Sequence, residues 1–276
     1  MRNTVSAGDT KQIIRGNPVR SLAKAVLLLE ALVDGTDSTP RELAERLGEP
    51  RTTVYRLLTG LEALDLVERG ERPGTWRLGL RLVRLGSAAT ERLDERRAAL
   101  PWMERIHEAT GETVFLCLRR GDQAVCVERI DGLRVQSIAL RLGGSLPLHA
   151  GAGPRTLLAW EPREEWAAFY ERQRPLERFT EETATTWAEL TDALEQIVAD
   201  GYAVSDEDVT PGIGSLGAPV FDYTGRIRAA LSIGGMRQLL LADMRVEALS
   251  LLLEGAREIS AALGHETAAS AALAAG

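Results

Sequence analysis

The strongest constraint on the fold is the order of short elements near the N-terminus. Apolar residues recur at helical spacing over residues 21–32 and predict an amphipathic first helix. After a run of turn residues, Thr39, Pro40 and Glu42 form a capping-box pattern with proline at the first helical position. Gly48 is suited to end this short second helix, because glycine readily adopts the left-handed conformation that follows a helix. The sequence therefore predicts two helices followed by a tight turn.

A third helix and a hairpin complete this pattern. The helix is predicted to begin at Pro50, and its apolar positions share one face: Val54, Leu57, Leu58, Leu61 and Leu64. Two short strand-like runs then flank a turn at residues 71–74. Helix, tight turn, helix and hairpin in this order are typical of a winged helix-turn-helix. We therefore expect a DNA-binding domain over residues 17–79, preceded by a disordered lead-in over residues 1–16.

The polar face of the third helix carries residue types that contact DNA. A recognition helix enters the major groove with its N-terminal end, so its first two turns supply the contacts. The candidates there are Arg51, Thr52, Thr53, Tyr55 and Arg56. Arginine can bind guanine or phosphate through paired hydrogen bonds, and Arg72 in the hairpin can reach phosphate or the minor groove. The same helix face also fits an ordinary solvated surface, and Glu68 and Glu71 can instead pair with the hairpin arginines.

Charge is divided unevenly along the chain. The formal net charge of −7 by itself argues against nucleic-acid binding. Residues 1–97, however, contain 17 basic and 14 acidic side chains, whereas the remainder contains 16 basic and 26 acidic ones. The mildly basic N-terminal part is therefore compatible with DNA binding. Because no apolar run approaches the roughly 20 residues of a membrane span, and no secretory signal is present, we expect a cytoplasmic protein without a membrane partner.

The rest of the chain has the pattern of a mixed α+β domain. A linker helix is predicted at residues 80–97, and a further helix follows from Leu100. The turn at residues 120–122 separates two apolar strands, and residues 136–144 are expected to form a third. Helices are then predicted at residues 156–160, 163–170, 187–200 and 243–263, and strands at residues 202–205, 216–221 and 229–234. This order predicts an antiparallel sheet in a domain over residues 98–265, followed by a disordered tail over residues 266–276.

Several segments between Ser21 and Leu263 carry a resemblance to a known family. In the first domain they are "SLAKAVLLLEAL" and "TPRELAERLGEPRTTVYRLLTGLEALDLVER". In the second they are "GETVFLCLRRGDQAVCVERI", "LPLHAGAGPRTLLAW" and "GYAVSDEDVTPGIGSLGAPVFDYTGRIRAALSIGG". In this order and spacing they resemble the IclR-type transcriptional regulators. The resemblance implies a GAF-like effector-binding domain, a homodimer or homotetramer, a two-fold symmetric double-stranded DNA operator, and a small-molecule effector that controls DNA affinity.

The resemblance also implies where the effector binds. The implied positions are Gly151, Ala152, Ser205, Asp206, Ser215, Ser232 and Gly234. Backbone amides at a helix N-terminus together with serine hydroxyls suit a carboxylate or another oxygen-rich ligand, although each residue also fits an ordinary turn or strand. Many family members have His-Ala-Thr-Ala-x-Gly-Lys where this chain runs from His149 to Arg155. Gly151 lacks the hydroxyl and Pro154 lacks a backbone donor, which favours a different ligand.

The sequence gives little support to catalysis. Its three histidines and its two cysteines, Cys117 and Cys126, have no metal-ligand spacing, and no phosphate-binding or nucleophile-elbow glycine motif is present. We therefore predict no enzyme activity, no metal and no cofactor. The alternative is a thiol reductase that uses Cys117 and Cys126, with the N-terminal helices as an oligomerisation module. Because both cysteines lie in apolar strands, we expect poorly reactive thiols. Repression and activation are both compatible with these patterns.

Overall fold

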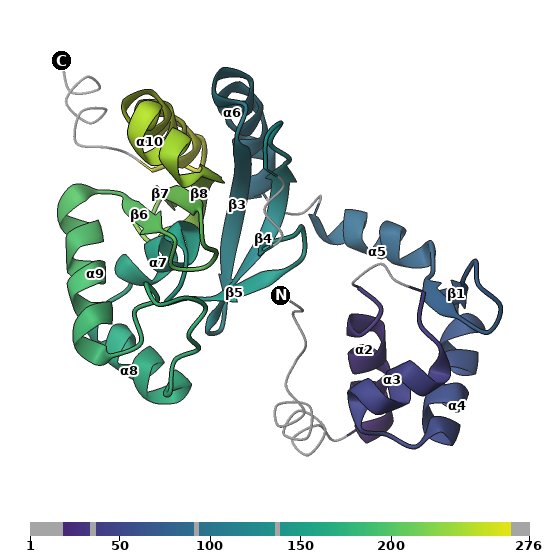
Figure 1. Cartoon of the computed structure of the whole chain (residues 1–276). Coiled ribbons are helices and arrows are strands. Elements are labelled where there is room, and N and C mark those ends of the chain that lie inside the picture. Colours follow the sequence, from purple (N-terminus) through teal and green to yellow (C-terminus); the bar gives the residue numbers. More distant parts are fainter. Residues whose placement is uncertain (1–18, 34–36, 91–93, 136–138, 266–276) are drawn as a thin grey trace. The chain divides into compact units, whose positions relative to one another are not determined.

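The computed structural model describes residues 19–33, 37–90, 94–135 and 139–265. The chain divides into two compact units, residues 1–92 and 93–276, each of which has its own core (Figure 1). The division falls within the segment that the sequence predicts as a linker helix. The expected lead-in and tail lie outside the described residues.

The first unit contains the predicted helix-turn-helix and hairpin. Its helices are α2 (Arg20–Glu30), α3 (Pro40–Leu47), α4 (Arg51–Glu62) and α5 (Arg81–Thr90). Strands β1 (Val67–Arg69) and β2 (Trp76–Leu78) pair antiparallel and, with the turn between them, form the wing. Apolar faces of the helices and the wing meet in one core, which contains Leu28, Leu43, Val54, Leu58, Leu61, Val67 and Trp76.

The predicted ends of α3 are confirmed. The Thr39 hydroxyl accepts a hydrogen bond from the backbone N–H of Glu42 at 3.3 Å, and the Glu42 carboxylate accepts one from the Thr39 N–H at 2.7 Å. Gly48 follows the helix with a φ of +64°, the left-handed conformation that favours glycine. These caps fix the tight turn, and α4 therefore begins at Arg51.

The second unit is built around one six-stranded antiparallel sheet with the order β5-β4-β3-β8-β7-β6. The strands are β3 (Thr113–Arg120), β4 (Gln123–Ile130), β5 (Ser145–Pro147), β6 (Ala203–Asp206), β7 (Ile213–Phe221) and β8 (Ile227–Met236). The helices are α6 (Asp94–Thr110), α7 (Ala152–Ala159), α8 (Arg163–Gln173), α9 (Trp187–Asp200) and α10 (Arg245–Ala262), with a π-helical turn, η1 (Leu239–Asp243), before α10. The sheet has helices on both of its faces (Figure 1).

Alternation along the central strand explains why both faces are covered. Val114, Leu116 and Leu118 of β3 pack with α6 and α10, whereas Phe115 and Cys117 pack with α7, α8 and α9. Successive side chains of a strand point to opposite faces, so a continuous apolar run needs a helical layer on each side. The predicted α+β class with an antiparallel sheet is therefore confirmed.

Three predicted elements differ most from the structure. The helix expected from Leu100 is α6, which begins at Asp94, so residues 94–97 of the predicted linker helix belong to α6. In the expected strand at residues 136–144, only residues 139–144 are described, and they form bends and a turn; the pairing strand is β5, which follows them. Gly143, with a φ of +75°, lies in that turn, and its N–H donates to the Cys126 carbonyl of β4 at 2.8 Å. Helix α7 begins at Ala152 rather than at Thr156, because Pro154 lies in its first turn, where a helix needs no N–H donor.

Candidate functional site

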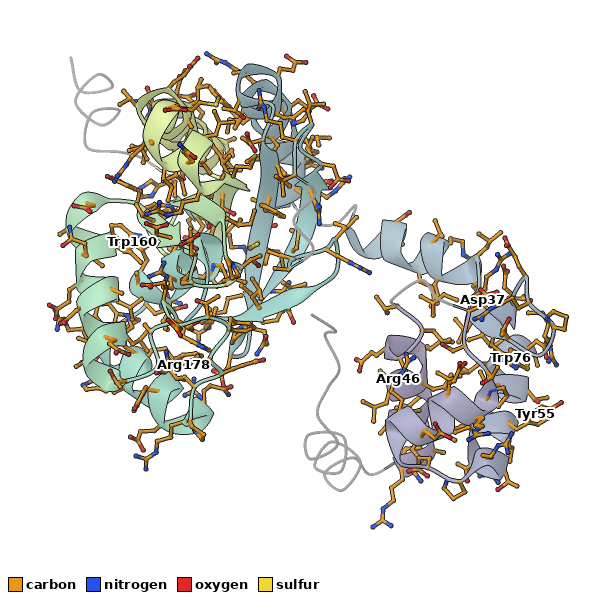
Figure 2. The ribbon with its side chains drawn as sticks, in the orientation of Figure 1. Asp37, Arg46, Tyr55, Trp76, Trp160 and Arg178 are labelled. Atoms are coloured by element: carbon orange, nitrogen blue, oxygen red, sulfur yellow. The ribbon has the colours of Figure 1, made fainter. Side chains whose placement is uncertain are left out.

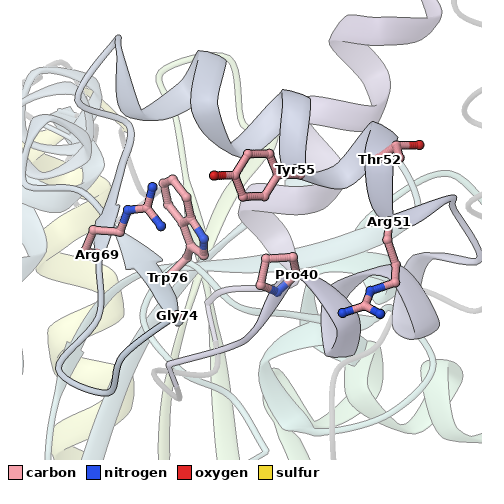
Figure 3. Close-up of a pocket in the computed structure, with 7 residues that line it drawn as sticks. All are labelled: Pro40, Arg51, Thr52, Tyr55, Arg69, Gly74 and Trp76. Carbon is pink, nitrogen blue, oxygen red and sulfur yellow. The ribbon is translucent and has the colours of Figure 1, made fainter.

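The first candidate site is the surface that joins α4 to the wing. A hollow of about 550 Å³ lies there and is lined by Pro40, Arg51, Thr52, Tyr55, Arg69, Gly74 and Trp76 (Figure 3). In the view of Figure 3, Trp76 lies between Arg69 and Tyr55, whereas Arg51 and Thr52 project at the other end. Arg51, Thr52, Tyr55 and Arg56 are exposed and Thr53 is half-buried, so the predicted residues share one solvent-facing region of α4.

The arginines of this surface differ in their partners. Arg69 donates to Glu62 at 2.9 Å and lies 3.8 Å over the Trp76 ring, and Arg77 donates to Glu68 at 2.8 Å. The side-chain hydrogen bond with Glu62 raises the pKa of Arg69, and one with Tyr55 adds to the effect. Arg69 and Arg77 therefore already have carboxylate partners within the first unit.

Arg51 and Arg56 have no such partners. Among the residues that the structure describes, no carboxylate forms an ion pair with either guanidinium. Pro50 precedes α4 without a side-chain cap, and the first turn of α4 contains no acidic residue. The N–H groups at this helix N-terminus are thus available to an anion, which the helix dipole favours.

Asp37 fixes the wing against the segment that precedes α3. Its Oδ2 atom accepts hydrogen bonds from the backbone N–H of Glu71 at 2.6 Å and from the Thr75 hydroxyl at 3.2 Å. The Arg72 guanidinium donates to the Asp37 carbonyl, so this predicted DNA-contacting residue is held at the turn of the wing. Ser38 also exchanges two backbone hydrogen bonds with Trp76. Figure 2 shows Asp37, Trp76 and Tyr55 within the first unit. No local sequence pattern points to Asp37, because its partners Glu71 and Thr75 lie more than thirty residues away.

The second candidate site is a cavity between the sheet and the N-terminal end of α7. Ser205, Ser215 and Gly234 are register partners across β6, β7 and β8, and they form one wall of it. Gly151, Ala152 and Ser232 also line the cavity, together with the Phe115 ring. Its volume is about 60 Å³. Six of the seven predicted effector-site residues therefore line one cavity.

The comparisons with known proteins identify the family of this chain. Residues 21–71 match the family model of the IclR helix-turn-helix domain, and residues 87–261 match that of the bacterial transcriptional regulator IclR C-terminal domain. The chain belongs to the IclR family of bacterial transcriptional regulators. It is 30% identical to the HTH-type transcriptional regulator KipR of Bacillus subtilis, over 90% of this chain and 99% of that protein. It is 31% identical to the HTH-type transcriptional repressor AllR of Escherichia coli, over 89% of this chain and 90% of that protein.

Solved structures of IclR-family proteins have the same fold. The IclR regulator of Alicyclobacillus acidocaldarius superimposes with a TM-score of 0.78 at 29% identity, over 90% of this chain and 100% of that one. An IclR homologue from Microbacterium hydrocarbonoxydans, solved in complex with 4-hydroxybenzoate, has a TM-score of 0.76 at 27% identity, over 88% of this chain and 98% of that one. KipR and AllR are a transcriptional regulator and a transcriptional repressor.

Asp206 is the predicted effector residue that this IclR-family protein places elsewhere. Its carboxylate is half-exposed and pairs with Arg237, whose Nη2 lies 2.9 Å from Asp206 Oδ2. Ser205 is buried and faces the cavity, and the next residue of a strand points to the opposite face. Asp208, two residues on, is instead buried beside the cavity, where its carboxylate accepts a hydrogen bond from the Gly151 N–H at 3.1 Å. Strand alternation was the signal that separates Asp206 from Ser205.

The two cysteines of this IclR-family protein do not resemble a reductase centre. Cys117 and Cys126 are cross-strand register partners on β3 and β4, and both are fully buried. A side-chain hydrogen bond with Cys126 and burial raise the pKa of the Cys117 thiol well above its ordinary value. A thiol with a raised pKa and no access to solvent is a poor nucleophile.

His149, next to the cavity loop, forms a hydrogen bond with the segment that follows α8. Its Nε2–H donates to the Glu177 carbonyl at 2.8 Å, and burial lowers the pKa of the imidazole.

None of the helices that the structure describes has both the length and the apolarity that a membrane span needs.

Proposed function

We propose that this IclR-family protein binds operator DNA with the N-terminal end of α4 and that a small anionic effector in the C-terminal cavity changes this affinity. The DNA-binding part of this proposal is supported by the two arginines at the start of α4. Arg51 and Arg56 are exposed at an uncapped helix N-terminus and lack carboxylate partners in the described part of the chain, whereas Arg69 and Arg77 are paired.

The roles on DNA follow from these differences. Arg51 and Arg56 bind guanine edges or phosphates, with Thr52, Thr53 and Tyr55 beside them on α4. Arg72 contacts phosphate or the minor groove from the turn of the wing. Arg69 and Arg77 position the wing through their ion pairs and contribute little charge to the DNA backbone.

The proposed domains are a DNA-binding domain over residues 17–79, a linker over residues 80–97 that contains α5 and the first residues of α6, and an effector-binding domain over residues 98–265. We also propose that the protein works as a homodimer or homotetramer, in the cytoplasm where operator DNA lies. Exposed apolar side chains near and within α5, at Leu80 and Val83, support pairing with a second copy.

The chemistry of the cavity supports a carboxylate effector with an apolar part. Serine hydroxyls of β6, β7 and β8 lie on one side, and apolar groups including the Phe115 ring lie on the other. Small-molecule sites combine such apolar walls with a few converging polar groups. The homologue from Microbacterium hydrocarbonoxydans was solved with 4-hydroxybenzoate, an aromatic carboxylate, which supports the same ligand class here.

Fluorescence anisotropy with purified full-length protein tests this function. A labelled duplex from upstream of the protein's own gene is compared with a scrambled duplex of the same composition, at several salt concentrations. We expect tighter binding to the first duplex at every salt concentration, and a change in that affinity with at least one carboxylate from a panel. Equal binding to both duplexes at all salt concentrations would contradict the proposal.

A further inference from the structure

We propose that Arg155 is the cation that binds the effector's carboxylate, and that Asp208 is a built-in carboxylate which the effector displaces. This inference rests on the effector-binding function proposed above and names the residue that recognises the ligand's charge.

Arg155 is a buried cation with unused hydrogen-bonding capacity. It lies near the N-terminal end of α7, and its Nη2 donates to the Val204 carbonyl at 2.7 Å. The same nitrogen lies 3.0 Å from Asp208 Oδ2. Its Nε atom is buried and has no hydrogen-bond acceptor among the described residues. Because a buried donor without an acceptor is costly, this atom points to a ligand that supplies an oxygen.

Asp208 already holds the position that a ligand carboxylate would take. Its carboxylate accepts hydrogen bonds from the Gly151 N–H and from the Ser205 hydroxyl, and it pairs with Arg155. A backbone amide beside a helix N-terminus, a hydroxyl and a guanidinium are together the donors that bind carboxylates in proteins. A ligand carboxylate can therefore replace Asp208 and keep each of these hydrogen bonds.

The cavity adjoins this carboxylate directly. Gly151 and Ser205 donate to Asp208 and also line the cavity, and so do Val209 and Thr210, which follow Asp208 in the chain. Ser232 is also buried and lines the cavity. It offers the ligand a second polar contact.

Displacement of Asp208 would also enlarge the cavity, which is too small for an effector. The cavity of about 60 Å³ is smaller than the roughly 300 Å³ of ordinary ligand sites, so its walls must move to admit an effector. Outward movement of Asp208 takes Val209 and Thr210 with it and enlarges the cavity. The cost is limited, because Arg155 keeps a carboxylate partner and Asp208 gains hydration.

Acetate and acetamide test this exchange, because they share one shape and differ in charge. Each is titrated by NMR into the wild-type protein and into the Asp208→Asn, Asp206→Asn and Asp208→Asn/Arg155→Gln variants. We expect Asp208→Asn to raise the acetate affinity about tenfold, since the competing buried carboxylate is gone, and to leave acetamide nearly unchanged. Asp206→Asn is the matched control and should behave as the wild type, and Arg155→Gln should abolish the gain.

A second measurement on the wild-type chain covers the case in which Asp208→Asn fails to fold. Hydrogen exchange at residues 207–212 should become faster with saturating acetate and stay unchanged with acetamide. An acetate affinity that is equal in all four proteins, a gain that survives the loss of Arg155, or unchanged exchange would overturn the inference. DNA binding that still responds to another carboxylate would then leave the proposed function standing.

Discussion

The Asp37 carboxylate accepts a 2.6 Å hydrogen bond from the backbone N–H of Glu71, across 34 positions of the chain. The carboxylate also accepts a hydrogen bond from the Thr75 hydroxyl. The backbone carbonyl of Asp37 accepts another from the Arg72 guanidinium. One acidic residue before the helix-turn-helix thus fixes the turn of the wing from both of its sides. The position of the wing, and with it of Arg72, depends on the ionised form of Asp37.

The stability of the first unit should therefore depend on pH through Asp37. Burial tends to raise the pKa of the Asp37 carboxyl. Hydrogen bonds from the backbone N–H groups of Arg72 and Glu71 and from the Thr75 side chain lower it by more, so the pKa lies below its ordinary value. With the lower pKa in the folded state, the stabilisation is present above the unfolded value near 3.8 and is lost as pH falls through the folded value. Thermal unfolding between pH 7 and pH 2 should show this loss, and Asp37→Asn should reduce it. An identical pH dependence in the variant would show that Asp37 does not stabilise the wing.

Substitution of Gly70 should destabilise the same anchor. A Cβ atom at Gly70 would lie 2.5 Å from both Asp37 Cγ and Thr75 Oγ1, closer than any real contact of this kind. We expect Gly70→Ala to cost about 1–3 kcal/mol in the free energy of unfolding, as overpacking generally does. The matched control is Gly60→Ala on α4, where a Cβ meets nothing within 4 Å, and alanine there should be neutral or stabilising. Equal stabilities of the two variants in urea unfolding would contradict this interpretation.

The exposed apolar residues beside α5 should contribute to self-association. Leu80 and Val83 are 77% and 64% exposed and lie three residues apart, on one side of the helical turn. We expect Val83→Glu to weaken the dimer, because a buried charge without a partner disfavours an interface. Val246→Glu is the control, since Val246 is 85% exposed and lies in the other unit. Sedimentation velocity over a range of concentrations distinguishes them, and an unchanged mass of the Val83 variant would exclude this surface.

The thiols should be unreactive in the folded protein. Cys117 and Cys126 are both fully buried, and the pKa of Cys117 is raised. A disulfide reagent that releases a coloured thiolate is added at pH 8, and the absorbance counts the reacted thiols. We expect neither cysteine to react in the native protein and both to react after denaturation. Rapid labelling of a native thiol would revive the reductase alternative.

Local patterns predicted the parts of the fold that depend on neighbouring residues. Helix α9 spans residues 187–200 as expected, and it ends at Gly201, which has a φ of +82°. The capping box of α3 and the strands around residues 120–122 were predicted for the same reason, because caps and hairpin turns are encoded within a few residues. Helix α7 was predicted too short, since its glycine- and proline-rich first turn also fits a loop.

Contacts between distant residues were not predictable from a single sequence. Asp208 was missed because its partners, Gly151 and Arg155, lie on another element more than fifty residues away. The sequence-based choice fell on Asp206, which has the same side chain but is half-exposed at the end of β6 and pairs with Arg237. Strand alternation is a local signal and separates Asp206 from its neighbour Ser205, whereas identifying Asp208 requires the fold.

The central claim is that α4 reads DNA through Arg51 and Arg56. Anisotropy titrations on the upstream duplex, at several salt concentrations, compare the wild type with Arg51→Ala/Arg56→Ala and with Arg77→Ala. We expect the double variant to lose about 2 kcal/mol or more of binding free energy and its preference over scrambled DNA, with a shallower salt dependence. Arg77→Ala should stay within about threefold of the wild type, because Arg77 is already paired with Glu68. Wild-type affinity and specificity in the double variant would contradict the account.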